Sequence, residues 1–160
     1  MTPIEVPTSL RLEIVVDVPQ RHAFSVFTEK FDRIKPREYN LLEVDVAETV
    51  FETRVGGHVY DRGVDGSICR WARVLAFDPP ERFVISWDID ARWQMETDPE
   101  RASEVEVRFI PLGPERTRVE LLHRHLDRHG DGWTDYRTGL AARGGWPIFL
   151  ERFQAAVTGP

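Results

Sequence analysis

The chain has 160 residues, of which 41% are hydrophobic and 30% charged, and its formal net charge is −6. This length and hydrophobic content suit one domain that buries most of its apolar surface, so we expect a single domain over residues 1–160. The negative charge repels a phosphate backbone and no Lys or Arg cluster offsets it, so nucleic-acid binding is not expected.

The first ten residues, MTPIEVPTSL, lack the basic and long apolar regions of a signal peptide. No apolar run along the chain approaches the ~20 residues that a membrane-spanning helix requires. The single cysteine, Cys69, has no partner for an internal disulfide. We therefore expect a soluble cytoplasmic protein with no membrane partner.

Residues 9–18, SLRLEIVVDV, alternate apolar and polar side chains, which is typical of a half-buried β-strand. Pro19 ends this pattern. The following residues, PQRHAFSVFTEKFDRI, place proline at the first helical position and repeat apolar residues at helical spacing. We expect a strand over residues 9–18 and a short helix over residues 19–34, which ends before Lys35 and Pro36.

Turn signals recur at hairpin intervals between residues 41 and 126, in the words VGGH, VDGS, FDPPE and LGPE. No stretch in this region has the pattern of a long helix. Apolar residues alternate in the segments between the turns, which predicts several antiparallel strands with one apolar side. The residues that share a side are Phe83, Ile85, Trp87 and Ile89, then Val105, Val107 and Phe109, then Val119, Leu121 and His123.

The tail GGWPIFLERFQAAV, residues 144–157, repeats apolar side chains at i, i+3, i+4, i+7 and i+11. This spacing predicts an amphipathic helix, and the only large apolar surface on which it can lie is the inner face of the strands. We therefore expect an α+β fold in which a long C-terminal helix lies on a curved antiparallel sheet. The predicted apolar stripe consists of Trp146, Phe149, Leu150, Phe153 and Val157.

Two stretches of the chain carry a family resemblance. VGGHVYDRGVDGSICRWARVLAFDPPERFVISWDI, residues 55–89, contains a Gly-Gly-x-aromatic strand, an Asp-Gly hairpin and a VL-x-x-x-PP-x-R run that ends in Ser-Trp. GGWPIFLERF, residues 144–153, resembles a C-terminal GW-x-x-x-L helix. Together with the predicted order of helices and strands, these motifs resemble those of the helix-grip fold of the START/SRPBCC superfamily. Within it they resemble the homologues of the activator of the ninety-kilodalton heat-shock protein ATPase, over essentially the whole chain.

The resemblance implies a curved antiparallel β-sheet that wraps around the long C-terminal helix and leaves a hydrophobic cavity between them. Members of the superfamily bind lipids, hormones or polyketides there, and a minority catalyse reactions. We therefore expect the chain to bind a small hydrophobic or amphipathic molecule, with no cofactor and no assignable reaction. From strand and helix phase, the expected lining is Ile85, Trp87, Val107, Phe109, Leu121, His123, Phe149 and Phe153.

Two other functions stay open at this stage. A cyclase or aromatase-type enzyme would use the same cavity and would need an acid or base inside it, for which only His123 has the right strand phase. A chaperone-linked interaction module is the second alternative. The motifs shared with the family, however, consist of residues that build the fold and do not mark an interface. The sequence also leaves the oligomeric state open, a homodimer included.

The segment LLHRHLDRHGDGW, residues 121–133, concentrates three of the five histidines. It is similar to the metallo-β-lactamase motif HxHxDH, but HRHLDRH is one residue longer and no histidine follows His129. An HxH pair on one strand face is a zinc-binding pattern, but Arg124 and Arg128 disfavour a cation here. We expect no metal, with His123 in the cavity lining and His125 and His129 at a solvated strand end.

Paired carboxylates occur in WDIDARW, where Asp88 and Asp90 could in principle share acid and base roles. They lie on the face opposite Trp87, so we expect them to be exposed. Cys69 follows no nucleophile motif and is expected to be a small, partly buried hydrophobic residue.

The five tryptophans are distributed between the core and the loops. Trp146 is expected to dock the C-terminal helix on the sheet, and Trp87 suits either core packing or the cavity wall. Trp93 and Trp133 are expected in loops, at the rim of an opening.

Overall fold

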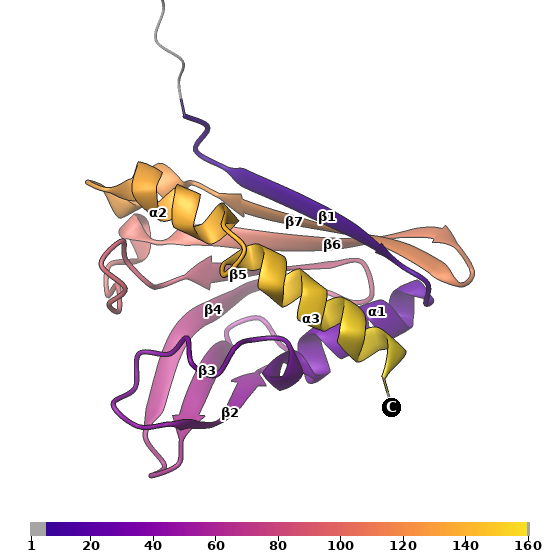
Figure 1. Cartoon of the computed structure of the whole chain (residues 1–160), viewed down its shortest axis with the longest axis horizontal. Helices are drawn as coiled ribbons and strands as arrows, with labels where there is room; N and C mark the ends of the chain where they lie inside the picture. The colour runs from indigo at the N-terminus through magenta and orange to yellow at the C-terminus, as the bar shows by residue number, and fades with distance from the viewer. Residues whose placement is uncertain (1–5, 160) are drawn as a thin grey trace, which may run out of the picture.

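The computed structural model describes residues 6–159, so residues 1–5, on which the expectation about a signal peptide partly rests, lie outside it. Seven antiparallel strands form one curled sheet in the order β1-β7-β6-β5-β4-β3-β2, and helices lie across its inner face (Figure 1). The strands are β1 (Leu10–Val16), β2 (Val46–Phe51), β3 (His58–Gly63), β4 (Ile68–Asp78), β5 (Arg82–Trp87), β6 (Ser103–Gly113) and β7 (Arg116–Arg124).

Three α-helices accompany the sheet: α1 (Gln20–Glu29), α2 (Trp133–Ala141) and α3 (Trp146–Thr158). Short 3-10 turns follow α1, precede β6 and follow β7, at Phe31–Arg33, Pro99–Arg101 and Leu126–His129. No helix within the described range is both long and apolar enough to cross a membrane.

The predicted fold class is confirmed, because α3 packs its apolar stripe against the inner face of the sheet. All five stripe residues are buried, and Trp146 keeps only 3% of its surface exposed. The alternation of β1 is also confirmed, since Leu10 and Val16 are buried while Arg11, Glu13 and Val15 are exposed. Pro19 lies one position earlier than predicted, as the N-cap of α1 rather than its first helical residue.

Hairpin turns occupy the predicted places. Gly56 and Gly66 have φ values of +88° and +86°, a left-handed conformation that glycine adopts without steric cost. The Asp-Gly hairpin therefore closes between β3 and β4 as the sequence indicated.

Helix α2 was not predicted. Its sequence, WTDYRTGLA, buries Tyr136 and Leu140, which are four residues apart and so lie on one helical face. Gly139 lowers the helix propensity of the segment, and two apolar anchors make a short pattern. The helix forms because these two side chains pack into the core.

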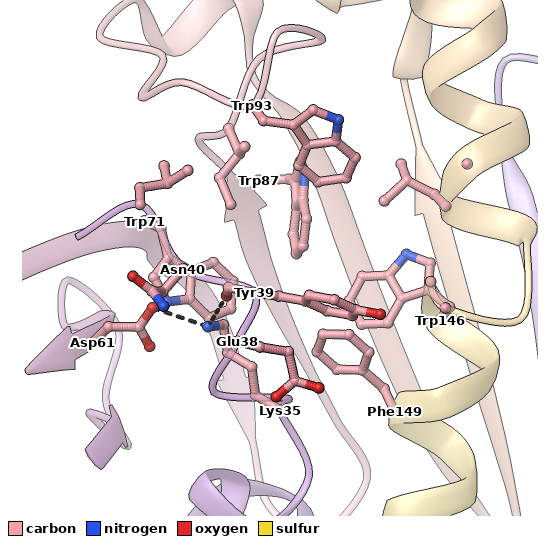
Figure 2. Close-up of a pocket in the computed structure, with 16 residues that line it drawn as sticks. Lys35, Glu38, Tyr39, Asn40, Asp61, Trp71, Trp87, Trp93, Trp146 and Phe149 are labelled. Carbon is pink, nitrogen blue, oxygen red and sulfur yellow. Dashed lines mark hydrogen bonds and ion pairs between the residues drawn. The ribbon is translucent and has the colours of Figure 1, made fainter. Parts of the chain in front are cut away.

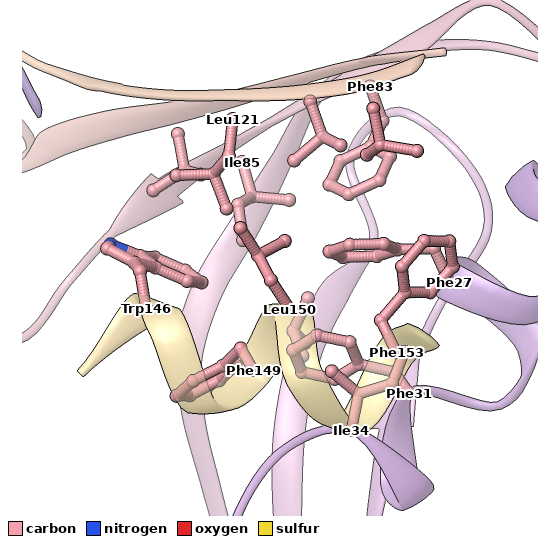
Figure 3. Close-up of a cluster of buried hydrophobic side chains, with 14 of the residues drawn as sticks. Phe27, Phe31, Ile34, Phe83, Ile85, Leu121, Trp146, Phe149, Leu150 and Phe153 are labelled. Atoms are coloured by element: carbon pink, nitrogen blue, oxygen red, sulfur yellow. The ribbon is translucent and has the colours of Figure 1, made fainter. Parts of the chain in front are cut away.

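A phenylalanine core fills the space between α1, the sheet and the C-terminal half of α3. The ring of Phe27 lies 5.0 Å from that of Phe153, and the rings of Phe51 and Phe83 are also 5.0 Å apart. Figure 3 shows Phe27, Phe31 and Phe153 gathered between helices and sheet. We define this core as Phe24, Phe27, Phe31, Phe51, Phe77, Phe83, Phe109 and Phe153.

Candidate functional site

A pocket of about 460 Å³ opens at the other end of α3 (Figure 2). Its wall is formed by inner-face side chains of β3, β4 and β5, by the loop after α1, by the end of α2 and by the first turn of α3. The lining comprises Lys35, Glu38, Tyr39, Asn40, Leu41, Asp61, Trp71, Trp87, Ile89, Trp93, Gly139, Leu140, Gly144, Gly145, Trp146 and Phe149.

Indole rings make up much of this wall. Four of the chain's five tryptophans line the pocket, and three of them are buried to 5% exposure or less. Trp87 is the centre of the group, because its ring lies 5.4 Å from that of Trp71 and 5.3 Å from that of Trp146. The pocket therefore offers flat, polarisable surfaces on several sides, which suit the faces of a planar ligand.

Hydrogen bonds fix the orientation of two of these rings. The Trp87 Nε1–H donates to the Tyr136 hydroxyl at 2.6 Å, and that hydroxyl donates to the Ile89 carbonyl at 2.8 Å. The Trp146 Nε1–H donates to His123 Nδ1 at 3.0 Å. Burial raises the pKa of Tyr136, so this phenol stays a neutral donor. Internal hydrogen bonds thus hold the Trp87 and Trp146 rings of the wall in place.

The hydrogen bonds of His123 also determine its tautomer. An indole only donates, so Nδ1 of His123 is the acceptor and its proton sits on Nε2, which donates to Ser103 Oγ at 2.7 Å. The Ser103 hydroxyl also shares a hydrogen bond of 2.7 Å with His129 Nε2. Burial lowers the pKa of His123 to about 3, and burial lowers the pKa of His129 as well. Both imidazoles are therefore neutral parts of a buried network.

The polar part of the wall is a buried ion pair. Lys35 Nζ lies 2.9 Å from Asp61 Oδ2, and the two residues are only 4% and 1% exposed. Lys35 also donates to the Tyr39 carbonyl, which fastens the loop after α1 to the pocket. Asp61 Oδ1 accepts a further hydrogen bond from Thr49 Oγ1 at 2.7 Å. The charges of the pair neutralise each other, and Glu38 and Asn40 are further polar side chains of the lining.

Trp93 stands at the rim of the pocket, as predicted, and is 53% exposed. Its backbone has a φ of +60°, which is unusual for a bulky residue. The turn is held by Asp90, whose carboxylate accepts hydrogen bonds from the backbone N–H groups of Arg92 and Gln94. The Trp93 ring packs edge-on against Tyr136 at 4.9 Å. A rigid turn therefore presents this indole at the mouth.

Of the eight residues predicted to line the cavity, Trp87 and Phe149 line the pocket. The other six are buried in the core around it and do not line it. Strand phase indicated the correct face of the sheet for the five strand residues among them, and helical spacing the buried face of α3 for Phe153. The pocket, however, lies at only one end of the sheet's inner face. These six are Ile85, Val107, Phe109, Leu121, His123 and Phe153.

The histidine segment requires one correction. His129 is buried at 4% exposure rather than solvated, because the turn after β7 folds it back onto Ser103. His125 has a φ of +62° and follows the end of β7, so strand parity does not place it beside His123. Both ring nitrogens of His123 are engaged by Ser103 and Trp146. This histidine positions a tryptophan of the wall.

Asp88 is also not exposed, contrary to expectation. It is 7% exposed on the outer face of the sheet, where Arg73 binds both carboxylate oxygens at 3.1 Å and Ser86 Oγ donates at 3.0 Å. A carboxylate can be buried here because a guanidinium binds it in bidentate geometry. Asp88 and Asp90 therefore have separate structural roles and do not work as a pair.

Cys69 and Trp133 complete the comparison with the sequence. Cys69 is half-buried, and burial followed by the charge of Asp61 raises the pKa of its thiol, which disfavours a nucleophilic thiolate. Trp133 begins α2 instead of lying in a loop, and it does not line the pocket.

Sequence reasoning missed the loop of residues 35–41 and the ion pair that anchors it. Lys35 directly follows a helical pattern and looks like an ordinary surface lysine, while Asp61 alternates with apolar residues along β3. The alternation of β3 was the available signal, since it places Asp61 on the same side as Val59 and Gly63, both of which are buried. An acid at an inward position requires a partner.

A family model described as Activator of Hsp90 ATPase homolog 1-like protein matches residues 17–158. A search of curated protein sequences finds no match. Among solved structures, the chain is 38% identical to Txn09, named an anthrahydroquino-γ-pyrone synthase, with a TM-score of 0.65. The match covers 97% of this chain and 99% of Txn09.

Two further structures extend the comparison. CalC from Micromonospora echinospora, named a self-sacrificing resistance protein, is 27% identical, with a TM-score of 0.66 and 94% of each chain covered. PFC0360w from Plasmodium falciparum, named an HSP90 activator, is 19% identical, with a TM-score of 0.60. That match covers 96% of this chain and 98% of PFC0360w, and at this identity it shows a shared fold alone.

Proposed function

The chain belongs to the family described as Activator of Hsp90 ATPase homolog 1-like protein, and on that premise we propose that it binds a small hydrophobic or amphipathic molecule in the tryptophan-walled pocket. Trp87, Trp146 and Phe149 are the proposed contacts of the buried wall, and Trp93 is the contact at the rim. A cytoplasmic location is part of the proposal.

The observation that carries this proposal is a preformed aromatic pocket with few polar groups. Its volume of about 460 Å³ falls within the range of roughly 300–1,000 Å³ that is usual for small-molecule sites. Hydrogen bonds hold the Trp87 and Trp146 rings in place, so little side-chain entropy would be lost on binding. The exposed rings of Trp93 and Tyr39 mark an entrance from solvent.

Thermal unfolding with three probes of different chemistry tests the proposal: oleic acid, flavone and 9,10-anthraquinone-2-sulfonate. A probe that binds only the folded state, at a hundred times its dissociation constant, adds about 2.7 kcal/mol. In a domain of this size this corresponds to a rise in melting temperature of roughly 5 to 11 °C. Native mass spectrometry of freshly purified protein would in addition reveal a retained ligand.

Amide hydrogen exchange then locates the bound probe. We expect protection in residues 35–41, 60–62, 70–72, 87–95 and 139–149, which contain the lining of the pocket, and no change in the strand residues around Phe83 and Phe109. If none of the three probes raises the melting temperature, or if protection falls outside these segments, the proposed function is wrong.

A second candidate is an enzyme that acts on a polycyclic aromatic substrate in the same pocket. The observation in its favour is the 38% identity, over nearly the whole chain, to a protein named an anthrahydroquino-γ-pyrone synthase. The ionisable side chains that line the pocket are Lys35, Glu38, Tyr39 and Asp61, so acid or base chemistry would fall to them and not to His123.

Chromatography of an anthrahydroquinone precursor incubated with the protein distinguishes the two candidates. Conversion to a γ-pyrone product over many turnovers would establish the enzyme. Tight binding of the precursor without product would favour a binding protein.

A further inference from the structure

We propose that Lys35, held by Asp61, forms a polar subsite in the pocket that selects aromatic ketones by donating a hydrogen bond to the ligand carbonyl. The inference rests on the proposed function, because it names the ligand class of the same pocket. In Figure 2, Lys35 and Asp61 lie on the side of the pocket opposite Trp146 and Phe149.

A count of donors and acceptors supports a ligand that brings an acceptor. The Lys35 ammonium has three N–H groups, of which Asp61 Oδ2 and the Tyr39 carbonyl engage two. Trp71 adds a second donor, since its buried Nε1–H meets no acceptor within residues 6–159. The two Asp61 oxygens already accept from Lys35 and Thr49. This part of the wall therefore has two N–H donors, one on Lys35 and one on Trp71, that are available to a ligand acceptor.

Charge decides which acceptor fits. Asp61 neutralises Lys35 at 2.9 Å, so a carboxylate or phosphate would add an unpaired negative charge to a buried site. A neutral carbonyl oxygen can accept from the remaining N–H without that cost. The aromatic walls formed by Trp87 and Trp146 suit a flat ring system attached to the carbonyl.

Stability does not account for the ion pair. Lys35 and Asp61 lose their hydration, and a buried pair of this kind is commonly no more stable than hydrophobic residues of similar size. Lys35 Nζ also lies over the Trp71 ring, 5.6 Å from its centroid, which orients the ammonium inside the aromatic wall. The pair anchors the loop after α1 through the Tyr39 carbonyl, and a contact with the ligand would give its remaining N–H group a second role.

Two probes of similar shape test the subsite: flavone, which carries a ring ketone, and 2-phenylnaphthalene, which is a hydrocarbon. Quenching of tryptophan fluorescence reports binding, because four of the five tryptophans line the pocket. An entirely apolar pocket would prefer the hydrocarbon, which is the more hydrophobic probe. With a hydrogen bond from the charged lysine, we expect flavone to bind at least about tenfold more tightly.

The triple variant Lys35→Met, Asp61→Leu, Thr49→Val replaces the polar cluster with apolar side chains and should reverse the preference. Persistence of the flavone preference in the variant would overturn the inference, as would a parent protein that binds the hydrocarbon equally or better. If the variant does not fold, the ratio of the two affinities in the parent decides alone. If the parent binds neither these probes nor any of the three used above, the proposed function itself fails.

Discussion

The two ends of α3 pack against different kinds of aromatic side chain. Toward its C-terminus, Phe153 enters the phenylalanine core and lies 5.0 Å from Phe27. At its first turn, Trp146 and Phe149 face the pocket, and Trp146 lies 5.3 Å from Trp87. One helix therefore covers a filled core at one end and a cavity at the other.

The difference comes from what each ring requires when it is buried. A phenyl ring has no polar atom, so phenylalanines can turn in any direction that fills space, and the phenylalanine core is filled in this way. An indole carries an N–H that can donate, and the rings of Trp87 and Trp146 are each fixed by one such bond, to Tyr136 and His123. Rings held at their edges cannot collapse into the space between them, so the pocket remains open.

The largest expected effect is on the filled end. Phe153→Ala should lower the free energy of unfolding by roughly 3 to 5 kcal/mol, because the side chain is fully buried and its removal leaves a cavity. Chemical denaturation measures the change. Flavone affinity should be unaltered if the variant is studied where it is fully folded, since Phe153 does not line the pocket. A loss below about 1 kcal/mol would mean that this end is not tightly packed.

Lowering the pH should destabilise the fold by protonating the buried histidines that bond to Ser103. The pKa of His123 is about 3 in the folded protein and 6.5 ordinarily, so below pH 6.5 the unfolded chain takes up the proton first. Stability from this group is complete above pH 6.5 and falls as the pH is lowered toward 3. Between pH 6.5 and 4.5 the loss is roughly 2 to 3 kcal/mol.

The matched variant for this experiment is His123→Gln, whose amide can replace both hydrogen bonds and does not titrate. Urea denaturation across the pH range should give a smaller slope of stability against pH in the variant than in the parent. Some slope should remain, because His129 is buried and its pKa is lowered as well. Identical slopes would show that folding does not change the pKa of His123.

Adjacent glycines at the corner between α2 and α3 should respond differently. A Cβ on Gly145 would lie 2.2 Å from the Leu140 carbonyl oxygen, so Gly145→Ala forces the backbone apart and should cost about 1 to 3 kcal/mol. A Cβ on Gly144 would meet only the Tyr39 hydroxyl, at 3.0 Å, and that side chain can move. Gly144→Ala should therefore change the melting temperature little, and equal losses in both variants would contradict this account of the corner.

The sequence predicted correctly which side chains face the inner side of the sheet, but it did not predict at which end of α3 the cavity lies. Period-2 alternation placed Ile85, Val107 and Leu121 on the inner side of the sheet, where they are buried. Alternation carries no information about position along the helix axis, so it did not reveal that the cavity lies beside Trp87 and away from Phe109. Such a position depends on which long-range neighbours fill the space.

The polar groups of the site were harder still to predict. The helical pattern that ends at Ile34 gives no reason to bury Lys35, and its partner Asp61 is 26 residues further along the chain. Asp88 and His129 were expected in solvent because charged or polar residues usually are. Arg73 binds both carboxylate oxygens of Asp88, and Ser103 forms a hydrogen bond with one ring nitrogen of His129. Partners so distant in the chain cannot be predicted from the local sequence pattern.

We expect Trp93→Gly, at the rim of the pocket, to have the smallest effect on stability. The same substitution should clearly weaken ligand binding. The left-handed backbone of Trp93, with a φ of +60°, costs an L-residue about 1 to 2 kcal/mol, and glycine removes that cost. Loss of the ring contact with Tyr136 costs about 0.5 to 1.5 kcal/mol, so the two effects should nearly cancel. The melting temperature should then stay within a few degrees of the parent. Flavone affinity should fall several-fold in the variant, and Trp133→Phe, outside the pocket, should leave it unchanged. Equal flavone affinities in the parent and both variants would show that the exposed Trp93 indole takes no part in binding. Only the buried rings of the pocket wall would then form the site.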